Sequence, residues 1–182
     1  APSSFVKERP VSMRRLGYKI AFWRDNAGTI HALEDHCPHR GANLYYGRNE
    51  ECGLRCAFHG WKFNVKGEVV DAPNHAGNQE QFCKHVRVNR YTAVERGGIV
   101  WVWLGQGETA PPFPDLPFMD LPATQRSVTS TEVPTNWVQG VEASMDSSHV
   151  GVLHESTTQI TAGGGNQRML MAQSLAPKLE FE

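Results

Sequence analysis

Short runs in which apolar and polar residues alternate recur along the first hundred residues, and this pattern predicts β-strands. Two pairs of runs flank turn-forming residues, at residues 25–28 in the first pair and at Lys66-Gly67 in the second. Many short strands joined by glycine turns predict an all-β sandwich or small barrel. The predicted strands are residues 17–22, 29–33, 61–65, 68–70, 86–88, 91–95 and 99–104.

The last of these strands carries large apolar side chains on both faces. Trp101 and Trp103 share one face, and Val100 and Val102 share the other. A buried strand ordinarily has this pattern, so both sets are predicted to belong to the core.

The composition changes at Gly105. Five prolines between residues 111 and 122 disfavour helix and strand, which predicts an extended connector. Residues 127–133 resemble one more strand, and Thr135 can cap a helix that follows it. We therefore predict a first domain at residues 1–110, a connector at 111–126 and the start of a second domain at 127–182.

Charge and composition exclude some classes of function. The chain has 182 residues, a net charge of −1 and 40% hydrophobic residues, which suffices for a real core and argues against a nucleic-acid partner. The longest strongly apolar run, residues 99–104, is far too short to cross a bilayer, and the N-terminus lacks the apolar region of a signal peptide. The sequence predicts a cytoplasmic protein that does not insert into a membrane.

Two Cys-His pairs stand between the predicted hairpins. Cys37-Pro38-His39 and Cys56-Ala57-Phe58-His59 are separated by sixteen residues, and a glycine follows each pair closely. Two thiolates and two imidazoles on two loops make four metal ligands. Structural zinc sites usually take their ligands as Cys-x2-Cys or His-x3-5-His, whereas a [2Fe–2S] cluster with one Cys-bound and one His-bound iron needs one ligand of each kind from each loop.

Three interpretations of these pairs remain open at this point: a Rieske-type cluster, a structural zinc site, and unrelated core residues. The two other cysteines, Cys52 and Cys83, are predicted to stay reduced because no secretion signal is seen. Nearby basic residues are either a docking patch for an electron donor or ordinary solvated surface, and these residues are Arg40, Arg48, Arg55, Lys84, Arg87 and Arg90.

A second candidate site follows the connector. On a continuous helix Glu142, Asp146 and His149 would share one face, at positions i, i+4 and i+7. His154 would lie about 140° round the helix from His149, so the helix must end or unwind near Gly151 for both to bind one ion. Two imidazoles with a carboxylate are the usual ligands of oxygen-activating Fe(II), whereas the alternative is an exposed amphipathic helix with incidental histidines.

Together these motifs resemble the oxygenase (alpha) component of Rieske non-haem iron ring-hydroxylating oxygenases. The stretches His36-Cys-Pro-His-Arg-Gly-Ala and Val94-Glu-Arg-Gly-Gly-Ile-Val-Trp are similar to its phthalate dioxygenase branch. The resemblance implies a mostly β, Rieske-type iron–sulfur domain of short antiparallel strands with two cluster-binding loops, followed by the helical start of an α+β catalytic domain.

The same resemblance implies roles for single residues. It assigns the cluster to Cys37, His39, Cys56 and His59, and the mononuclear iron to His149 and His154. Asp146 would connect a Rieske histidine of one subunit to an iron histidine of the next within a homotrimer, or would orient His149.

The resemblance also implies partners and a longer chain. A flavin-containing or iron–sulfur reductase would pass electrons from NAD(P)H to the cluster, and the mononuclear Fe(II) would use O2 to hydroxylate a small aromatic acid of the phthalate or benzoate type. The third iron ligand, a carboxylate, is expected downstream of residue 182, so the sequence is expected to be an incomplete chain. The alternative function is a Rieske electron-transfer protein without its own catalytic iron, which would not need the stretch at residues 136–154.

Overall fold

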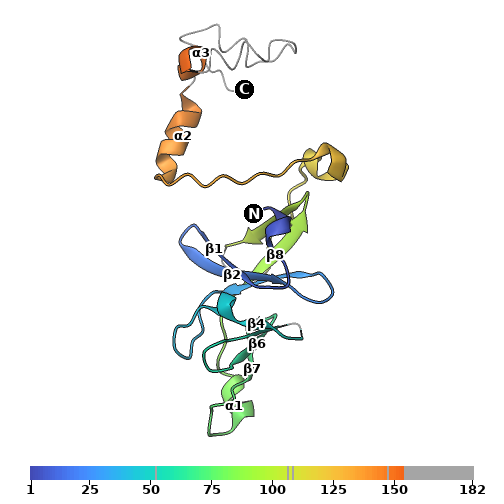
Figure 1. Ribbon diagram of the computed structural model, residues 1–182, viewed down its shortest axis with the longest axis vertical. Helices are drawn as coiled ribbons and strands as arrows, with labels where there is room; N and C mark the ends of the chain where they lie inside the picture. The colour runs from blue at the N-terminus through green and yellow to red at the C-terminus, as the bar shows by residue number, and fades with distance from the viewer. Residues whose placement is uncertain (52, 106, 108, 147, 154–182) are drawn as a thin grey trace. The chain divides into compact units, whose positions relative to one another are not determined.

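The computed structural model describes residues 1–51, 53–105, 107, 109–146 and 148–153 (Figure 1). The chain divides into two compact units, Ala1–Ser130 and a second unit that begins at Thr131. The strands of the first unit are β1 Val11–Arg15, β2 Tyr18–Arg24, β3 Ile30–Glu34, β4 Arg48–Asn49, β5 Gly53–Arg55, β6 Lys62–Asn64, β7 Val69–Asp71, β8 Arg90–Arg96 and β9 Ile99–Trp103. Its helices are the 3-10 turns η1 Ser3–Phe5, η2 Leu44–Tyr46, η3 Pro117–Asp120 and η4 Ala123–Gln125, and the α-helix α1 Gln79–Cys83.

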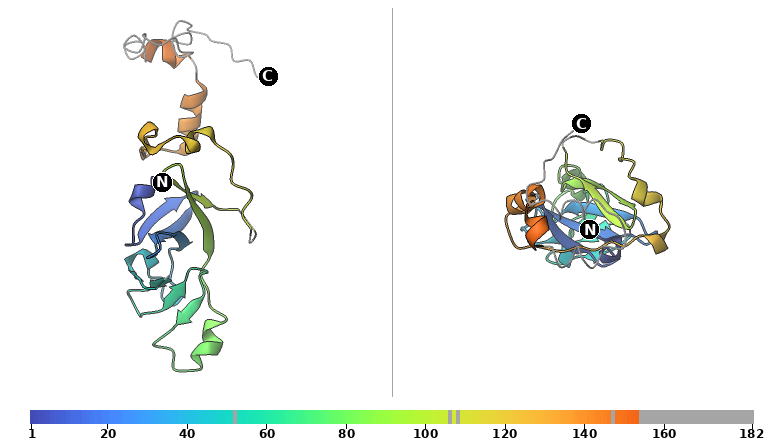
Figure 2. Two further views of the ribbon diagram at one scale, coloured as in Figure 1. Left: turned by 90° about the vertical axis from the view of Figure 1, so that its right-hand side faces the viewer. Right: turned by 90° about the horizontal axis from the view of Figure 1, so that it is seen from above.

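The strands form two antiparallel sheets. The larger sheet has the order β1-β2-β3-β8-β9, and the smaller has the order β4-β5-β6-β7. The chain leaves the larger sheet after β3, builds the whole smaller sheet and α1, and returns to it at β8. Figures 1 and 2 show the smaller sheet between the larger sheet and α1. This excursion holds both Cys-His pairs, so the smaller sheet is the scaffold of the candidate site.

Strand β2 has apolar side chains on both faces, and each face belongs to a different core. Ile20 and Phe22 pack with one core, which also contains Val6 and Val100. The alternate residues, Ala21 and Trp23, face the other way and join a second core, whose other members are Leu33, Cys37, Leu44, Leu54, Cys56, Trp61, Phe63, Val69, Ala72 and Val88. The second core therefore ties the larger sheet to the smaller one through the candidate ligand cysteines.

Both predicted hairpins are confirmed. β2 pairs with β3 and β6 with β7, and the first turn is closed by hydrogen bonds from Asp25 N to Thr29 O (3.0 Å) and from Gly28 N to Asp25 O (2.9 Å). Gly28 has φ +84°, a conformation that strongly favours glycine. The mostly β fold class and the β8–β9 hairpin are also confirmed.

Two predicted strands are wrong. In residues 86–88 Arg87 makes only an isolated bridge with Glu68, although Val88 N donates to Gly67 O (2.8 Å). Residues 127–133 form no strand, because none of the described strands pairs with them and most of their side chains are exposed. The alternation along this segment therefore has no sheet face against which to pack.

The prediction for β9 holds for only one of its faces. Val100 is buried, and Val102 packs against the same core. Trp101 and Trp103 are only half-buried and line an apolar hollow of about 220 Å³ together with residues 110–114 of the proline-rich segment. Trp101 meets Phe113 edge to face, with ring centroids 5.5 Å apart. The tryptophan face is thus covered by the connector rather than by a second sheet.

The described part of the second unit consists of α2 Trp137–Met145 and α3 His149–Leu153. Asn136, not the predicted Thr135, caps α2, since its side chain accepts a hydrogen bond from Val138 N (3.0 Å). The continuous helix expected through His149 is also wrong. The backbone turns extended at Asp146 (ψ 107°), so α2 ends there, well before Gly151, and His149 opens a separate helix.

No helix within the described ranges is long and apolar enough to cross a membrane.

Candidate metal centres

The first Cys-His pair lies in a tight loop after β3. Gly41 N donates to Cys37 O and Cys37 N donates to Ala42 O, both at 2.8 Å, so the cysteine closes the loop with both of its backbone groups. Gly41 has φ +72°, which lets the chain reverse direction directly after the ligands.

The second loop, between β5 and β6, repeats this arrangement. Gly60 N donates to Cys56 O (3.1 Å) and Cys56 N donates to Trp61 O (2.8 Å). Gly60 has φ +78°, and a Cβ at this position would come within 3.2 Å of Pro73 Cγ. A side chain at residue 60 would therefore be strained by the backbone conformation and would press on Pro73.

The two loops bring the two cysteines together. Cys37 and Cys56 are both buried, and they lie close enough for Cys56 to affect the pKa of Cys37. Burial raises the pKa of the Cys37 thiol to about 11, and the neighbouring Cys56 adds to the rise, whereas hydrogen bonds from the N–H groups of His39 and Arg40 oppose it. These N–H groups favour the thiolate, which is the form that binds metal.

The two histidines also come together. The rings of His39 and His59 meet edge to face, with centroids 4.6 Å apart. Partial burial, then the charges of His59 and Arg40, lower the pKa of His39, which favours the neutral imidazole that ligates metals. His59 Nδ1 is buried without a hydrogen-bond partner among the described residues, as a nitrogen meant for a metal would be.

The donor set therefore fits a [2Fe–2S] cluster with mixed ligands. Cys37 and Cys56 would hold one iron and His39 and His59 the other, since the structure pairs sulfur with sulfur and ring with ring. Among the described residues, no three His, Cys, Asp or Glu side chains form a set that could hold a single metal ion.

Trp61 and Asn74 support this site, and the sequence interpretation missed both roles. The indole of Trp61 stacks on His39 (centroids 4.7 Å apart, planes at 9°), and its Nε1 donates to Asn74 Oδ1 (2.7 Å). Asn74 Nδ2 lies 3.5 Å from His39 Nε2. The position of Trp61 directly after Gly60 was a usable signal, but no sequence pattern marks Asn74.

Two of the basic residues near the pairs, Arg48 and Arg55, are ion-paired within the fold. Arg55 is bound to Glu50 (2.6 Å) and to Asp71 (2.7 Å), and Arg48 is bound to the same Glu50 (3.1 Å). These ion pairs offset much of the charge of Arg48 and Arg55. The interpretation of the six basic residues as a docking patch stays a prediction.

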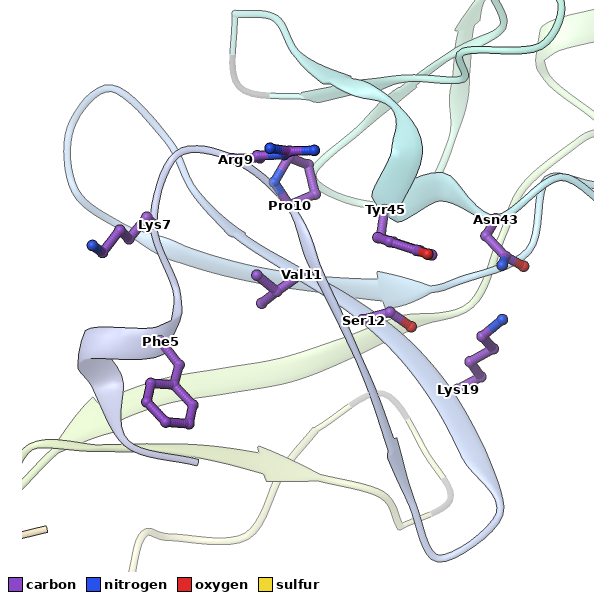
Figure 3. A pocket seen from close by; sticks show the side chains of 9 residues that line it. All are labelled: Phe5, Lys7, Arg9, Pro10, Val11, Ser12, Lys19, Asn43 and Tyr45. Carbon is purple, nitrogen blue, oxygen red and sulfur yellow. The ribbon is translucent and has the colours of Figure 1, made fainter. Parts of the chain in front are cut away.

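A separate hollow of about 580 Å³ lies between the N-terminal segment and the end of the first ligand loop. Figure 3 shows Lys7 and Lys19 on opposite sides of it. Its lining consists of Phe5, Lys7, Arg9, Pro10, Val11, Ser12, Lys19, Asn43 and Tyr45. None of the predicted ligands lines this hollow, so it is separate from the cluster site.

The second unit holds part of the predicted iron site. Asp146 Oδ2 lies 3.3 Å from His149 Nδ1, across the break between α2 and α3, and Asp146 Oδ1 accepts from Ser148 N (2.9 Å). The helix break thus brings the carboxylate to the imidazole. The carbonyl of Glu142 accepts from Asp146 N (3.0 Å), which is the backbone hydrogen bond at the C-terminal end of α2. His154 lies outside the described residues.

Comparisons with known proteins agree with the cluster chemistry. Residues 1–92 match the family described as the Rieske [2Fe-2S] domain. The chain is 39% identical over 145 residues to the oxygenase subunit of 3-chlorobenzoate-3,4-dioxygenase from Comamonas testosteroni, which covers 80% of this chain and 33% of that protein. It is 35% identical over 178 residues to the oxygenase subunit of phthalate 4,5-dioxygenase from Pseudomonas putida, covering 95% of this chain and 40% of that protein.

Among solved structures, the terminal oxygenase of carbazole 1,9a-dioxygenase from Novosphingobium sp. KA1 is similar over 83% of this chain and 41% of its own, with 29% identity and a TM-score of 0.65. The chain therefore spans about two fifths, or less, of the length of each of these proteins.

Proposed function

Because the chain belongs to the Rieske [2Fe-2S] domain family through residues 1–92, we propose that it is part of the oxygenase component of a multicomponent oxygenase that hydroxylates a small aromatic acid. The observation that carries the proposal is the pairing of Cys37 with Cys56 and of His39 with His59 on two similar loops. The similarity to the oxygenase subunit of phthalate 4,5-dioxygenase covers 95% of this chain. This similarity supports the second part of the proposal, that the chain belongs to an oxygenase.

The bound cluster would supply a one-electron carrier whose potential is higher than that of a four-cysteine cluster, because two neutral imidazoles replace two thiolates. The chain's own residues set its surroundings. The N–H groups of His39 and Arg40 donate to the Cys37 sulfur, and the indole of Trp61 fixes the plane of the His39 ring. A hydrogen bond to sulfur stabilises added negative charge, so these groups favour the reduced state.

His149 and His154 would hold the mononuclear iron of the parent protein, with a carboxylate from elsewhere in that protein as the third ligand. Asp146 would orient the His149 ring, because its Oδ2 lies 3.3 Å from His149 Nδ1. In a trimer of the parent, the same carboxylate would reach a cluster histidine of the neighbouring subunit and carry the electron between the two centres. Its side chain is 51% exposed, which is compatible with an interface role.

The proposed electron source is a flavin-containing or iron–sulfur reductase that oxidises NAD(P)H, and O2 is the co-substrate. The relatives named above act on 3-chlorobenzoate and on phthalate, and from these names we propose a benzoate- or phthalate-type aromatic acid as substrate. The three-part division into residues 1–110, 111–126 and 127–182 stays a prediction beside the two units of the fold.

The first experiment tests the cluster. The purified chain is expected to be red-brown, with two irons and two acid-labile sulfides, and its reduced form is expected to give the EPR spectrum of mixed Cys and His ligation. A spectrum typical of four-cysteine ligation, or stoichiometric zinc, would contradict the assignment of the four ligands.

The second experiment tests the oxygenase assignment in the full-length parent. With reductase, NAD(P)H, Fe(II) and 18O2, we expect labelled hydroxyl groups in a benzoate or phthalate panel. A cluster that is reduced and reoxidised without any labelled product, and without binding of Fe(II), would instead identify a Rieske electron-transfer protein.

A further inference from the structure

Arg55 is the residue directly before the ligand Cys56, and its side chain crosses the base of the second ligand loop. Its Nη1 donates to the carbonyl of Gly60 and to Asp71 Oδ2 (2.7 Å), and its Nε donates to Glu50 Oε2 (2.6 Å). Only 19% of the side chain is exposed. The guanidinium therefore joins the start of the loop, the end of the loop and strand β7.

The hydrogen bond from Arg55 to the Gly60 carbonyl lies next to the proposed ligand His59. Gly60 lies between His59 and Trp61, and its left-handed backbone (φ +78°) turns its carbonyl away from the path of a regular strand. A movement of this carbonyl would move His59 on one side and Trp61 on the other, and Trp61 carries the stack on His39. One bond from Arg55 thus acts on both imidazoles.

Two carboxylates hold the guanidinium in that place. Hydrogen bonds with Glu50, followed by those with Asp71, raise the pKa of Arg55, and the bond to Arg55 is the main cause that lowers the pKa of Glu50. Such charge-assisted bonds are shorter and stronger than neutral ones, and the rigid fork of Arg makes several of them at fixed angles. A partly buried, neutralised guanidinium with three acceptors is therefore a rigid support rather than a mobile surface charge.

We propose that Arg55 is a positioning residue of the iron–sulfur site, which fixes the turn at Gly60 and thereby the orientation of His59. This inference rests on the cluster alone, and it stands or falls independently of the oxygenase assignment. Arg55 contacts the second loop directly and acts on His39 of the first loop only through the stack of Trp61 on His39. The first loop also has a charged residue of its own that supports it. Asp35, two residues before Cys37, accepts from Ser12 Oγ (2.6 Å) and from Tyr45 N (2.9 Å).

The test compares Arg55→Lys and Arg55→Ala with the matched control Arg48→Ala in the cluster-loaded chain. Arg48 shares Glu50 with Arg55, but 69% of its side chain is exposed. The readouts are the EPR g-values and line widths of the reduced cluster and the rate at which iron is lost to a chelator. A lysine keeps the charge but cannot reach three acceptors in a fixed geometry, so it separates charge from positioning.

We expect both Arg55 variants to have broader EPR lines with shifted g-values, and iron loss about ten times faster in Arg55→Ala, as the loss of a hydrogen bond to a charged group predicts. Arg48→Ala should match the unmodified chain in both readouts. The proposal is overturned if Arg55→Lys has the unmodified spectrum and rate, since charge alone would then suffice. If Arg55→Ala does not fold, the EPR spectrum and the rate of iron loss of Arg55→Lys alone test the proposal.

Discussion

The imidazole of His39 and the indole of Trp61 are stacked almost in parallel, with ring centroids 4.7 Å apart and planes at 9°. The two residues come from different ligand loops, so the stack joins the loops to each other. Trp61 is 7% exposed and belongs to the core that contains both ligand cysteines. The orientation of a proposed iron ligand is thus fixed by packing in the same core that stabilises the domain.

We therefore expect Trp61→Leu to lose cluster and stability together. Removal of the ring leaves a cavity and frees His39, at a cost of roughly 2–4 kcal/mol in the free energy of unfolding. Trp61→Phe keeps an aromatic ring but loses the bond from Nε1 to Asn74 Oδ1, so about 1–2 kcal/mol is expected. Denaturant unfolding and the visible absorbance of the cluster measure the two effects.

Trp101→Leu is the matched control for that experiment. Trp101 lines the hollow beside residues 110–114 and contacts Phe113, not a ligand. The Trp101→Leu variant should have a lower free energy of unfolding, while the visible absorbance of its cluster stays unchanged. Equal bleaching in the variants at residues 61 and 101 would show that cluster loss simply follows unfolding.

Substitution of one ligand should change the potential in a known direction. His39→Cys should retain a cluster but lower its reduction potential by roughly a hundred millivolts or more, because a charged thiolate replaces a neutral imidazole. A redox titration followed by EPR measures this. His85→Cys, at an exposed histidine whose Nδ1 meets Gln81 O, controls for an added thiol. An unchanged potential in His39→Cys would remove His39 from the ligand set.

The first hairpin turn should make stability depend on pH. Asp25 is 9% exposed, and its hydrogen bond with His31 (2.8 Å), together with N–H groups of Thr29 and Ala27, lowers its pKa. A lowered folded-state pKa stabilises the fold above the ordinary value near 4, and this stabilisation is lost as the pH falls through the lower folded value.

Asp25→Asn should therefore reduce the free energy of unfolding by about 1–2 kcal/mol at pH 7, and the difference from the unmodified chain should shrink below pH 4. Denaturant midpoints measured from pH 3 to pH 7 test this. A difference that stays constant over the whole range would mean that the charge of Asp25 does not contribute.

The sequence predicted those parts of the molecule that depend on local patterns. Both hairpins around the ligand loops follow from alternation and turn residues. The assignment of the four cluster ligands, which the resemblance implies, stays a prediction. The sequence did not predict the smallest strands, because β4 and β5 have only two and three residues and depend on tertiary pairing. α1, with five residues, is likewise too short for a periodic signal.

The errors have physical reasons of the same kind. Residues 127–133 have the composition of a strand but no partner strand in the described part of the chain, and a strand is defined by its neighbour. The helix expected to run through His149 stops at Asp146, where the carboxylate accepts from Ser148 N in place of a continued helical bond. The roles of Asn74 and Arg55 depend on contacts between distant segments, which no local pattern contains.

Asp146 can be tested by a nearly isosteric change in the complete oxygenase component proposed above. Asp146→Asn should leave both metals bound and the cluster reducible, while product formation collapses, because the variant keeps the shape but loses the charge that faces His149. Glu142→Gln, an exposed carboxylate on the same helix, is the matched control and should retain turnover. Iron analysis, cluster reduction and product yield distinguish the cases. Equal loss of iron and activity would make Asp146 a structural support of His149, and normal turnover would remove it from electron transfer.

The last prediction concerns the 182-residue chain as it stands. We expect it to take up the cluster and to bind mononuclear Fe(II) weakly, because two neutral imidazoles leave the charge of the ion uncompensated. The apolar side chains of α2 also lack cover within the described residues, with Val138 38%, Val141 43% and Met145 72% exposed. The helix that precedes His149 is therefore loosely held, and a metal ligand on such a support is poorly preorganised. With Fe(II), reductase and a nicotinamide donor, the cluster should bleach without coupled hydroxylation of benzoate-type substrates. The full-length oxygenase subunit of a relative serves as the positive control, and stoichiometric product from this chain alone would show that a carboxylate within it completes the iron site.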